Sequence, residues 1–269
     1  MKEKITIIGG GNLGSSIAKG IVSIDQVSKE NLVICEKRKQ RCIYLNELGF
    51  NVIEGDIAKA VQGANIVIVS VKPQQFGKLL EELKPLLKPG QILVSTVTGV
   101  FLDEIEAIIG KHPIVRIMPN TAIEIREAMT CLCFKNISKE QEEKILDLFN
   151  SMGKTLVLLE DLLDAVTVLG ACGIAFALRF IRAATQGGIE IGFGAELSQF
   201  IVSQTVNGAA RLLLENNSHP EAEIDKVTTP QGITISGLNE MEHQGFSSSV
   251  IKGLIASYNK LLAIQSGKK

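Results

Sequence analysis

ITIIGGGNLG, residues 5–14, is the stretch that decides the fold of this chain. Four apolar residues lead into the pattern Gly9-x-Gly11-x-x-Gly14, and apolar residues at helical spacing follow. A strand, a glycine turn and a helix in this order are the context of the dinucleotide fingerprint, in which the glycines make a tight turn, admit a pyrophosphate and pack the helix on the strand. The segment predicts a dinucleotide site at Gly9, Gly11, Asn12, Leu13 and Gly14. The alternative is a glycine turn without a ligand.

A second predicted strand, Leu32 to Cys35, ends at Glu36, Lys37 and Arg38. This position faces the adenosine ribose, where an acid binds the diol of NAD and basic groups accept the extra phosphate of NADP. The sequence has both kinds of residue. We expect NADPH as the cofactor, with NADH as the alternative, although a solvated helix start also explains the basic pair.

Further apolar runs alternate with helical patterns. The predicted strands are 66–71, 92–97, 114–118, 129–134 and 155–159, and the predicted helices between them are 75–87, 102–109 and 140–150. Such alternation indicates a doubly wound parallel sheet, whose ligands lie beyond the carboxyl ends of the strands. Val71, Lys72, Pro73 and Asn120 occupy such ends and are candidate ligand-site residues. For Lys72 taken alone an ordinary surface lysine is favoured, and for Asn120 a helix cap is the alternative.

The pattern changes after Glu160. We find no strand from there on, only helical segments at 161–190, 196–216, 233–244 and 247–265. We therefore expect an α/β fold with two domains: a Rossmann-like domain over 1–160 and an all-helical domain over 161–269. The apolar content of the helical half is high for one small bundle, which suggests a homodimer built through it.

The amino-acid composition limits the classes of partner that the chain is expected to bind. With 28 Lys and Arg against 29 Asp and Glu, the chain has no overall field that attracts nucleic acid, so a small-molecule substrate is expected. Five cysteines without a C-x-x-C pair and three scattered histidines give no metal site. The longest uncharged run, Ala165 to Leu178, is too short to cross a bilayer and suggests a buried helix. We expect a cytoplasmic protein with no membrane contact.

The segment DKVTTPQGITISGLNEM, residues 225–241, is a candidate substrate site. Threonines and a proline precede a helix, whose first turn offers unpaired N–H groups to a small carboxylate. An ordinary capped helix is the alternative. No lysine lies between Thr155 and Asp225, and His219 is the one histidine there, so the usual base of a hydroxy-acid dehydrogenase is scarce. An imine needs only one proton at nitrogen, which Thr234, bonded to water or Lys72, is able to supply.

Five motifs together mark a family. With these motifs the chain resembles the pyrroline-5-carboxylate reductases over nearly its whole length: Gly9 to Gly14, Val71-Lys72-Pro73-Gln74, Met118 to Thr121, Glu160 to Thr167, and Val227 to Thr234. The resemblance implies a Rossmann domain and a helical dimerisation domain, with dimers often assembled as a pentamer of dimers. It also implies reduction of 1-pyrroline-5-carboxylate to L-proline, the final step of proline biosynthesis, with NADPH or NADH.

The resemblance also implies roles for individual residues. The turn formed by Thr229, Gln231, Gly232, Ile233 and Thr234 would hold the substrate carboxylate, and Thr234 would protonate the imine nitrogen. Lys72 and Asn120 would line the cofactor, with Lys72 also near the chemistry. Cys172 lies in the helix start that faces the nicotinamide and the substrate in the family.

The chain departs from the family pattern at three places. Gly170 to Phe176 reads GACGIAF where the family has SGSGPAY, Ala122 replaces a proline, and Gln231 replaces a glycine. These changes leave a related cyclic imine open as the substrate. A hydroxy-acid dehydrogenase on the same fold and a non-catalytic NAD(P)-binding redox sensor also stay open as functions. For Cys172, a small core residue is favoured over a redox role.

Overall fold

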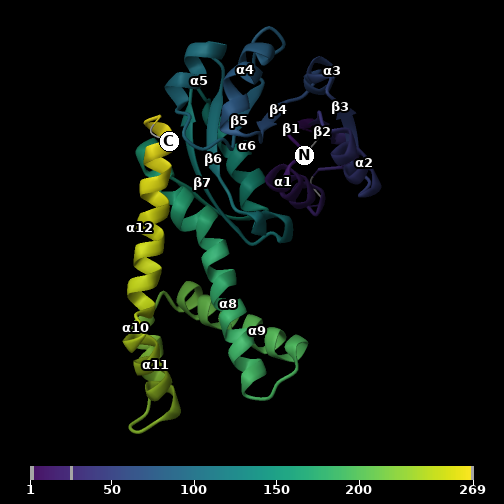
Figure 1. Cartoon of the computed structure of the whole chain (residues 1–269). Coiled ribbons are helices and arrows are strands. Elements are labelled where there is room, and N and C mark those ends of the chain that lie inside the picture. The colour runs from purple at the N-terminus through teal and green to yellow at the C-terminus, as the bar shows by residue number, and fades with distance from the viewer. Residues whose placement is uncertain (1–2, 25–26, 268–269) are drawn as a thin grey trace. The chain divides into compact units, whose positions relative to one another are not determined.

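The computed structural model describes residues 3–24 and 27–267 (Figure 1). The chain divides into two compact units: Met1–Cys172 with Leu261–Lys269, and Gly173–Lys260. The helical run from Glu160 to Cys172 belongs by its contacts to the first unit. The expected boundary near residue 160 stays a prediction.

The first unit is built on an eight-stranded sheet with the order β3-β2-β1-β4-β5-β6-β7-β8. The strands are β1 (Ile5–Ile8), β2 (Leu32–Glu36), β3 (Asn51–Glu54), β4 (Ile66–Val69), β5 (Ile92–Ser95), β6 (Ile114–Met118), β7 (Ala128–Lys135) and β8 (Gly153–Val157). All neighbours pair in parallel except β6 and β7, which are antiparallel. The doubly wound α/β sheet is confirmed, and the expectation that every strand is parallel is wrong at β7.

The central strands are apolar on both faces because helices cover both faces of the sheet. Every residue of β1, β4, β5 and β6 is buried. Alternate residues of these strands enter two different cores: Ile66 and Ile68 pack with the first, and Val67 and Val69 with the second. The edge strand β3 has exposed ends and only two apolar residues, which explains why the sequence pattern did not reveal it.

The helices of the first unit follow the strands in alternation (Figure 1). They are α1 (Asn12–Val22), α2 (Lys39–Glu47), α3 (Ile57–Val61), α4 (Pro73–Leu83), α5 (Leu102–Ile109), α6 (Lys139–Asn150) and α7 (Leu163–Val166). Buried residues of α1, α2 and α6 join the first core, whereas those of α4 and α5 join the second. This arrangement brings the carboxyl ends of β1, β2 and β4 to one edge of the sheet, where the candidate site lies.

The second unit is entirely helical. It contains α8 (Gly173–Glu190), α9 (Ala195–Asn216), α10 (Pro220–Lys226), α11 (Ile233–His243) and most of α12 (Phe246–Gln265). Helices α8 and α9 pack closely at Gly188, where an added Cβ would lie 2.1 Å from Ser198 Oγ. Ser198 Oγ in turn donates to the carbonyl of Thr185 at 2.8 Å.

The apolar side chains of the second unit lie largely on its surface. Thr185 and Ser198 are the only buried residues in 173–260, whereas Phe200 is 70% exposed and Leu214 is 81% exposed. The expectation of a buried helix at Ala165–Leu178 is wrong for the single chain. The helical run Glu160–Glu190 has the length and composition of a membrane span, and only 17% of its most apolar window is buried within the chain. A surface of this kind normally contacts another molecule.

Candidate cofactor and substrate sites

The glycine turn between β1 and α1 has the geometry that the fingerprint requires. Gly9 has φ +103°, and its N–H donates to the carbonyl of Cys35 at 2.8 Å. A Cβ at Gly9 would lie 2.2 Å from the carbonyl oxygen of Ser70, and one at Gly14 would lie 2.0 Å from the carbonyl oxygen of Gly9. Contacts this short are excluded for real side chains, so both positions require glycine. A Cβ at Gly11 would meet no heavy atom within 4 Å, which leaves open space beside the turn.

A cavity of about 920 Å³ opens at this turn. It brings together ten of the twelve residues predicted to contact the cofactor: Gly9, Gly11, Asn12, Leu13, Glu36, Lys37, Arg38, Val71, Lys72 and Pro73. The loop Thr96 to Thr98, which follows β5, also lines it. Gly14 and Asn120 are not among the lining residues. The direct contact of these residues with a cofactor stays a prediction.

Glu36 lies at the end of β2 and is almost completely buried. Its Oε1 accepts the Arg38 N–H at 2.9 Å and Arg38 Nε at 3.0 Å, while Oε2 accepts Arg38 Nη2 and the Gly10 N–H, both at 3.0 Å. Burial by itself raises the pKa of Glu36, but these hydrogen bonds outweigh it and lower the pKa below its usual value. The carboxylate is therefore ionised at neutral pH and fully engaged with donors of the chain.

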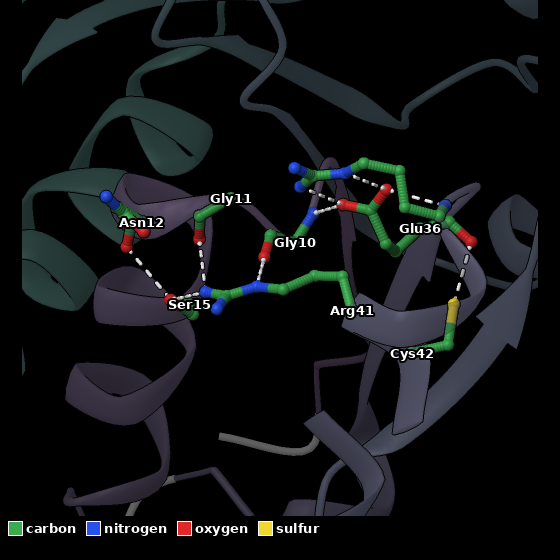
Figure 2. A network of polar contacts seen from close by, with 8 residues as sticks. Gly10, Gly11, Asn12, Ser15, Glu36, Arg41 and Cys42 are labelled. Carbon is green, nitrogen blue, oxygen red and sulfur yellow. Dashed lines mark hydrogen bonds and ion pairs between the residues drawn. The ribbon is translucent and has the colours of Figure 1, made fainter. Parts of the chain in front are cut away.

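Arg41, on α2, is a site residue that the sequence interpretation missed. Figure 2 shows its side chain reaching the glycine turn, where Nε donates to the Gly10 carbonyl at 2.6 Å. Its Nη2 donates to the Gly11 carbonyl at 3.2 Å and to Ser15 Oγ at 2.8 Å. The sequence did contain a signal for Arg41. It lies three residues after Arg38, within the first turn of α2, and residues at this spacing lie on the same side of a helix.

Lys72 and Asn120 are placed differently by the structure. Lys72 is the exposed N-cap residue of α4 and lines the cavity. Asn120 has the capping role that was its alternative: its Oδ1 accepts the Ala122 N–H at 3.1 Å. Its Nδ2 also donates to the carbonyl of Gly170 at 3.3 Å. Asn120 thus connects the loop after β6 to Gly170, the first residue of the segment that departs from the family pattern.

The segment Gly170–Phe176, which departs from the family pattern, begins within a π-helical turn, Thr167–Cys172. π-Helical turns are rare in proteins, and those that occur often lie at functional sites. Cys172 is half-buried here, so the expectation that it is a core residue is only partly met. Its part in substrate binding stays a prediction.

The Thr229–Thr234 turn lies in the second unit and runs into the first turn of α11. The Gly232 N–H donates to the Thr229 carbonyl at 2.9 Å, and Gln231 has φ +57°, in the left-handed region. Thr229, Gln231 and Thr234 are exposed, and Ile233 is 93% exposed. The first N–H groups of α11 have no intrahelical acceptor, so the turn presents hydroxyls and free donors to solvent.

His219, the one histidine between Thr155 and Asp225, already has a structural role. Its Nδ1 accepts the Glu221 N–H at 3.3 Å and caps α10. Among the residues that the structure describes, no group of three or more His, Cys, Asp or Glu side chains is placed to hold a metal ion.

Pyrroline-5-carboxylate reductase 2 of Dictyostelium discoideum is 40% identical over 275 residues, which cover 96% of this chain and 92% of that protein. The chain belongs to the pyrroline-5-carboxylate reductase family. Pyrroline-5-carboxylate reductase 1 of the same organism is 43% identical over 98% of this chain, which spans about half (50%) of that relative's length. The resemblance seen in the sequence motifs is confirmed.

Family models and solved structures agree with this membership. A model described as pyrroline-5-carboxylate reductase dimerisation matches residues 160–263, and one described as NADP oxidoreductase coenzyme F420-dependent matches residues 4–99. The crystal structure of Plasmodium falciparum pyrroline carboxylate reductase with NADP bound has a TM-score of 0.87 at 27% identity, covering 98% of both chains. The expected Rossmann-like domain followed by a helical dimerisation domain is confirmed.

Proposed function

We propose that the chain is a pyrroline-5-carboxylate reductase that reduces 1-pyrroline-5-carboxylate to L-proline with a reduced nicotinamide dinucleotide. The observation that carries this proposal is membership of the family over nearly the whole of this chain, together with a glycine-turn cavity at the carboxyl edge of the sheet. The second Dictyostelium reductase and this chain cover each other almost completely, so neither half lacks a counterpart.

The cavity residues fit a dinucleotide. The open space beside Gly11 leaves room for a group that approaches the backbone closely, and the N–H groups at the start of α1 point to such a group with the positive end of the helix dipole. Lys37 and Arg38 add cations at the adenosine end, which supports NADPH over NADH. The bound NADP of the Plasmodium structure supports the same preference.

The catalytic requirement is a hydride at the imine carbon and a proton at the imine nitrogen. The cofactor, when bound, supplies the hydride. The hydroxyl of Thr229 and the free N–H groups at the start of α11 would hold the substrate carboxylate, which fixes the ring by one end. The Thr234 hydroxyl would donate the proton to nitrogen and recover one from solvent, to which it is exposed. Lys72 lines the cavity and would add a positive charge to its wall.

A direct assay tests the proposal. Purified protein, 1-pyrroline-5-carboxylate and NADPH should show loss of the reduced-nicotinamide absorbance, with proline appearing in equal amount. A control without the imine should show no loss. Tight NADPH binding without turnover would contradict the proposal and favour the redox-sensor alternative.

We also propose that the helical unit forms a homodimer and that dimers assemble further as a pentamer of dimers. The exposed apolar residues of 173–260 and the match to a dimerisation model support the first step. The same partner surface accounts for the apolar run Glu160–Glu190 without a membrane, so we propose a soluble cytoplasmic protein. Light scattering should give at least a dimer at micromolar concentration; a monomer would contradict the homodimer.

A further inference from the structure

Gly10, the middle glycine of the turn, is held by ionised side chains on both of its polar groups. Figure 2 shows Gly10 between Glu36 and Arg41. Its N–H donates to Glu36 Oε2 at 3.0 Å, and its carbonyl accepts from Arg41 Nε at 2.6 Å. Hydrogen bonds to charged groups are about twice as strong as neutral ones. Glu36 and Arg41 come from the β2–α2 region, so the neighbouring strand and helix determine the conformation of the turn.

The hydrogen-bonding capacity of Glu36 is used up. A carboxylate has about four lone-pair sites. Arg38 supplies three donors and the Gly10 N–H supplies a fourth. An acid at this position ordinarily accepts the ribose hydroxyls of NAD. Here, ribose hydroxyls would have to displace an existing partner of Glu36.

Arg41 also forms hydrogen bonds with residues other than Gly10. Its Nη2 reaches the Gly11 carbonyl and Ser15 Oγ, and its guanidinium lies 4.7 Å from the ring centroid of Tyr44. The Gly10 and Gly11 carbonyls therefore face Arg41, which leaves the N–H groups at the start of α1 for a phosphate. Lys39, two residues earlier, is exposed and makes none of these contacts.

We propose that Glu36 and Arg41 are positioning residues that clamp the Gly10 peptide and hold the phosphate-binding turn in shape, and that Glu36 does not read the adenosine ribose. The proposal rests on the proposed function, since it takes the cavity to be a dinucleotide site. Its consequence concerns selectivity. The clamp acts on the pyrophosphate, which NADH and NADPH share, so Glu36 confers no preference between them. Discrimination is left to the cations beside it, Lys37 and Arg38.

Dissociation constants for both cofactors test the clamp without turnover. The chain has no tryptophan, so NADH and NADPH fluorescence can be followed directly. We expect Glu36→Gln and Arg41→Met each to weaken NADH and NADPH by a common factor of about ten, because each removes charge-assisted bonds to the turn. Lys39→Met, which also removes one cation from α2, should leave both constants unchanged.

A fragment separates the clamp from a general loss of structure. Adenosine 2′-phosphate lacks the pyrophosphate, so its affinity, measured by calorimetry, should change less than threefold in Arg41→Met. Loss of NADH binding alone in Glu36→Gln, with NADPH unchanged or tighter, would overturn the proposal and restore the acid as a diol ligand. Equal effects of Lys39→Met and Arg41→Met would also overturn it. Failure of the wild-type protein to bind either cofactor would instead refute the proposed function, and the clamp with it.

Discussion

The glycine turn before α1 and the threonine turn before α11 both present helix N-termini, but they are held by different means. The first is fixed by residues distant in sequence: Glu36 and Arg41 bind Gly10 from the next strand and helix. The second is held by local bonds, such as Gly232 N–H to the Thr229 carbonyl at 2.9 Å and Thr228 Oγ1 to the Ile224 carbonyl at 2.8 Å. Its threonines Thr229 and Thr234 are exposed.

The difference suggests that the two turns affect different properties of the protein. The glycine turn is preorganised within one chain, so binding there costs little ordering of the backbone. The threonine turn belongs to a unit with almost no buried residues of its own, and its final environment depends on what covers that unit. We therefore expect changes at the first turn to affect folding and cofactor affinity, and changes at the second to affect turnover.

Thr234→Ala should give the largest effect and should be confined to catalysis. Loss of a positioned proton donor should lower kcat by about 100-fold or more. Because Thr234 is exposed and lies outside the glycine-turn cavity, the NADPH dissociation constant and the unfolding temperature should stay at wild-type values. Steady-state kinetics and cofactor titration on the same preparation check both parts.

Thr234→Ser is the matched control, since it keeps the hydroxyl and should recover most of the rate. A wild-type kcat in Thr234→Ala would remove the assignment of the proton donor.

The pair Gly14→Ala and Gly11→Ala separates folding from binding within the glycine turn. A Cβ at Gly14 would lie 2.0 Å from the Gly9 carbonyl oxygen, so this variant should lose about 3 kcal/mol of unfolding free energy. A Cβ at Gly11 meets only open space, so that variant should keep its stability and bind NADPH about tenfold more weakly. Urea unfolding and cofactor titration give the two readouts. Equal stability of the two variants would show that the turn is not as tightly held as the structure indicates.

A smaller effect is expected from the titration of Glu36. Its pKa in the folded protein lies below the ordinary value of 4.5, so its ionised form stabilises the fold above that value. The contribution is lost as pH falls through the lowered pKa. The difference in unfolding temperature between wild type and Glu36→Gln should thus be constant from pH 7 to about 5 and shrink towards pH 3. A difference that does not change with pH would mean that the charge of Glu36 does not stabilise the fold.

Gln231→Gly should have the smallest effect. The left-handed backbone at Gln231 costs about 1–2 kcal/mol, and glycine removes that cost while adding about 0.5–1 kcal/mol of chain entropy in the unfolded state. The net expectation is a gain of about 0.5 kcal/mol in unfolding free energy, measured by urea denaturation. Gln231→Ala keeps the strain and should show no gain. A destabilised Gln231→Gly would mean that the glutamine side chain holds the turn.

Sequence patterns predicted the strands in which all neighbouring residues are apolar. The runs of β1, β4, β5 and β6 are apolar throughout because both faces of these strands are covered. The exposed edge strand β3 gave no such signal. The antiparallel direction of β7 was not predicted either, because an apolar run does not encode the direction of its strand.

The candidate site was predictable where the motif itself makes the geometry, as in Gly9 and Gly14. The site was not predictable where it depends on hydrogen bonds between side chains and residues distant in sequence. Glu36 was expected to be available for a ribose, yet Arg38 and Gly10 take its lone pairs. The contact of Arg41 with the turn depends on how α2 packs beside α1, which no local pattern contains.

One measurement tests most directly whether this chain adds a hydride and a proton across a cyclic imine. The protein is incubated with 1-pyrroline-5-carboxylate and NADPH that carries deuterium at the transferable position, and the product is analysed by mass spectrometry. We predict proline with a single deuterium on the ring carbon that was double-bonded to nitrogen, and one NADPH consumed per proline. Unlabelled proline, or no proline in the presence of bound NADPH, would contradict the assignment.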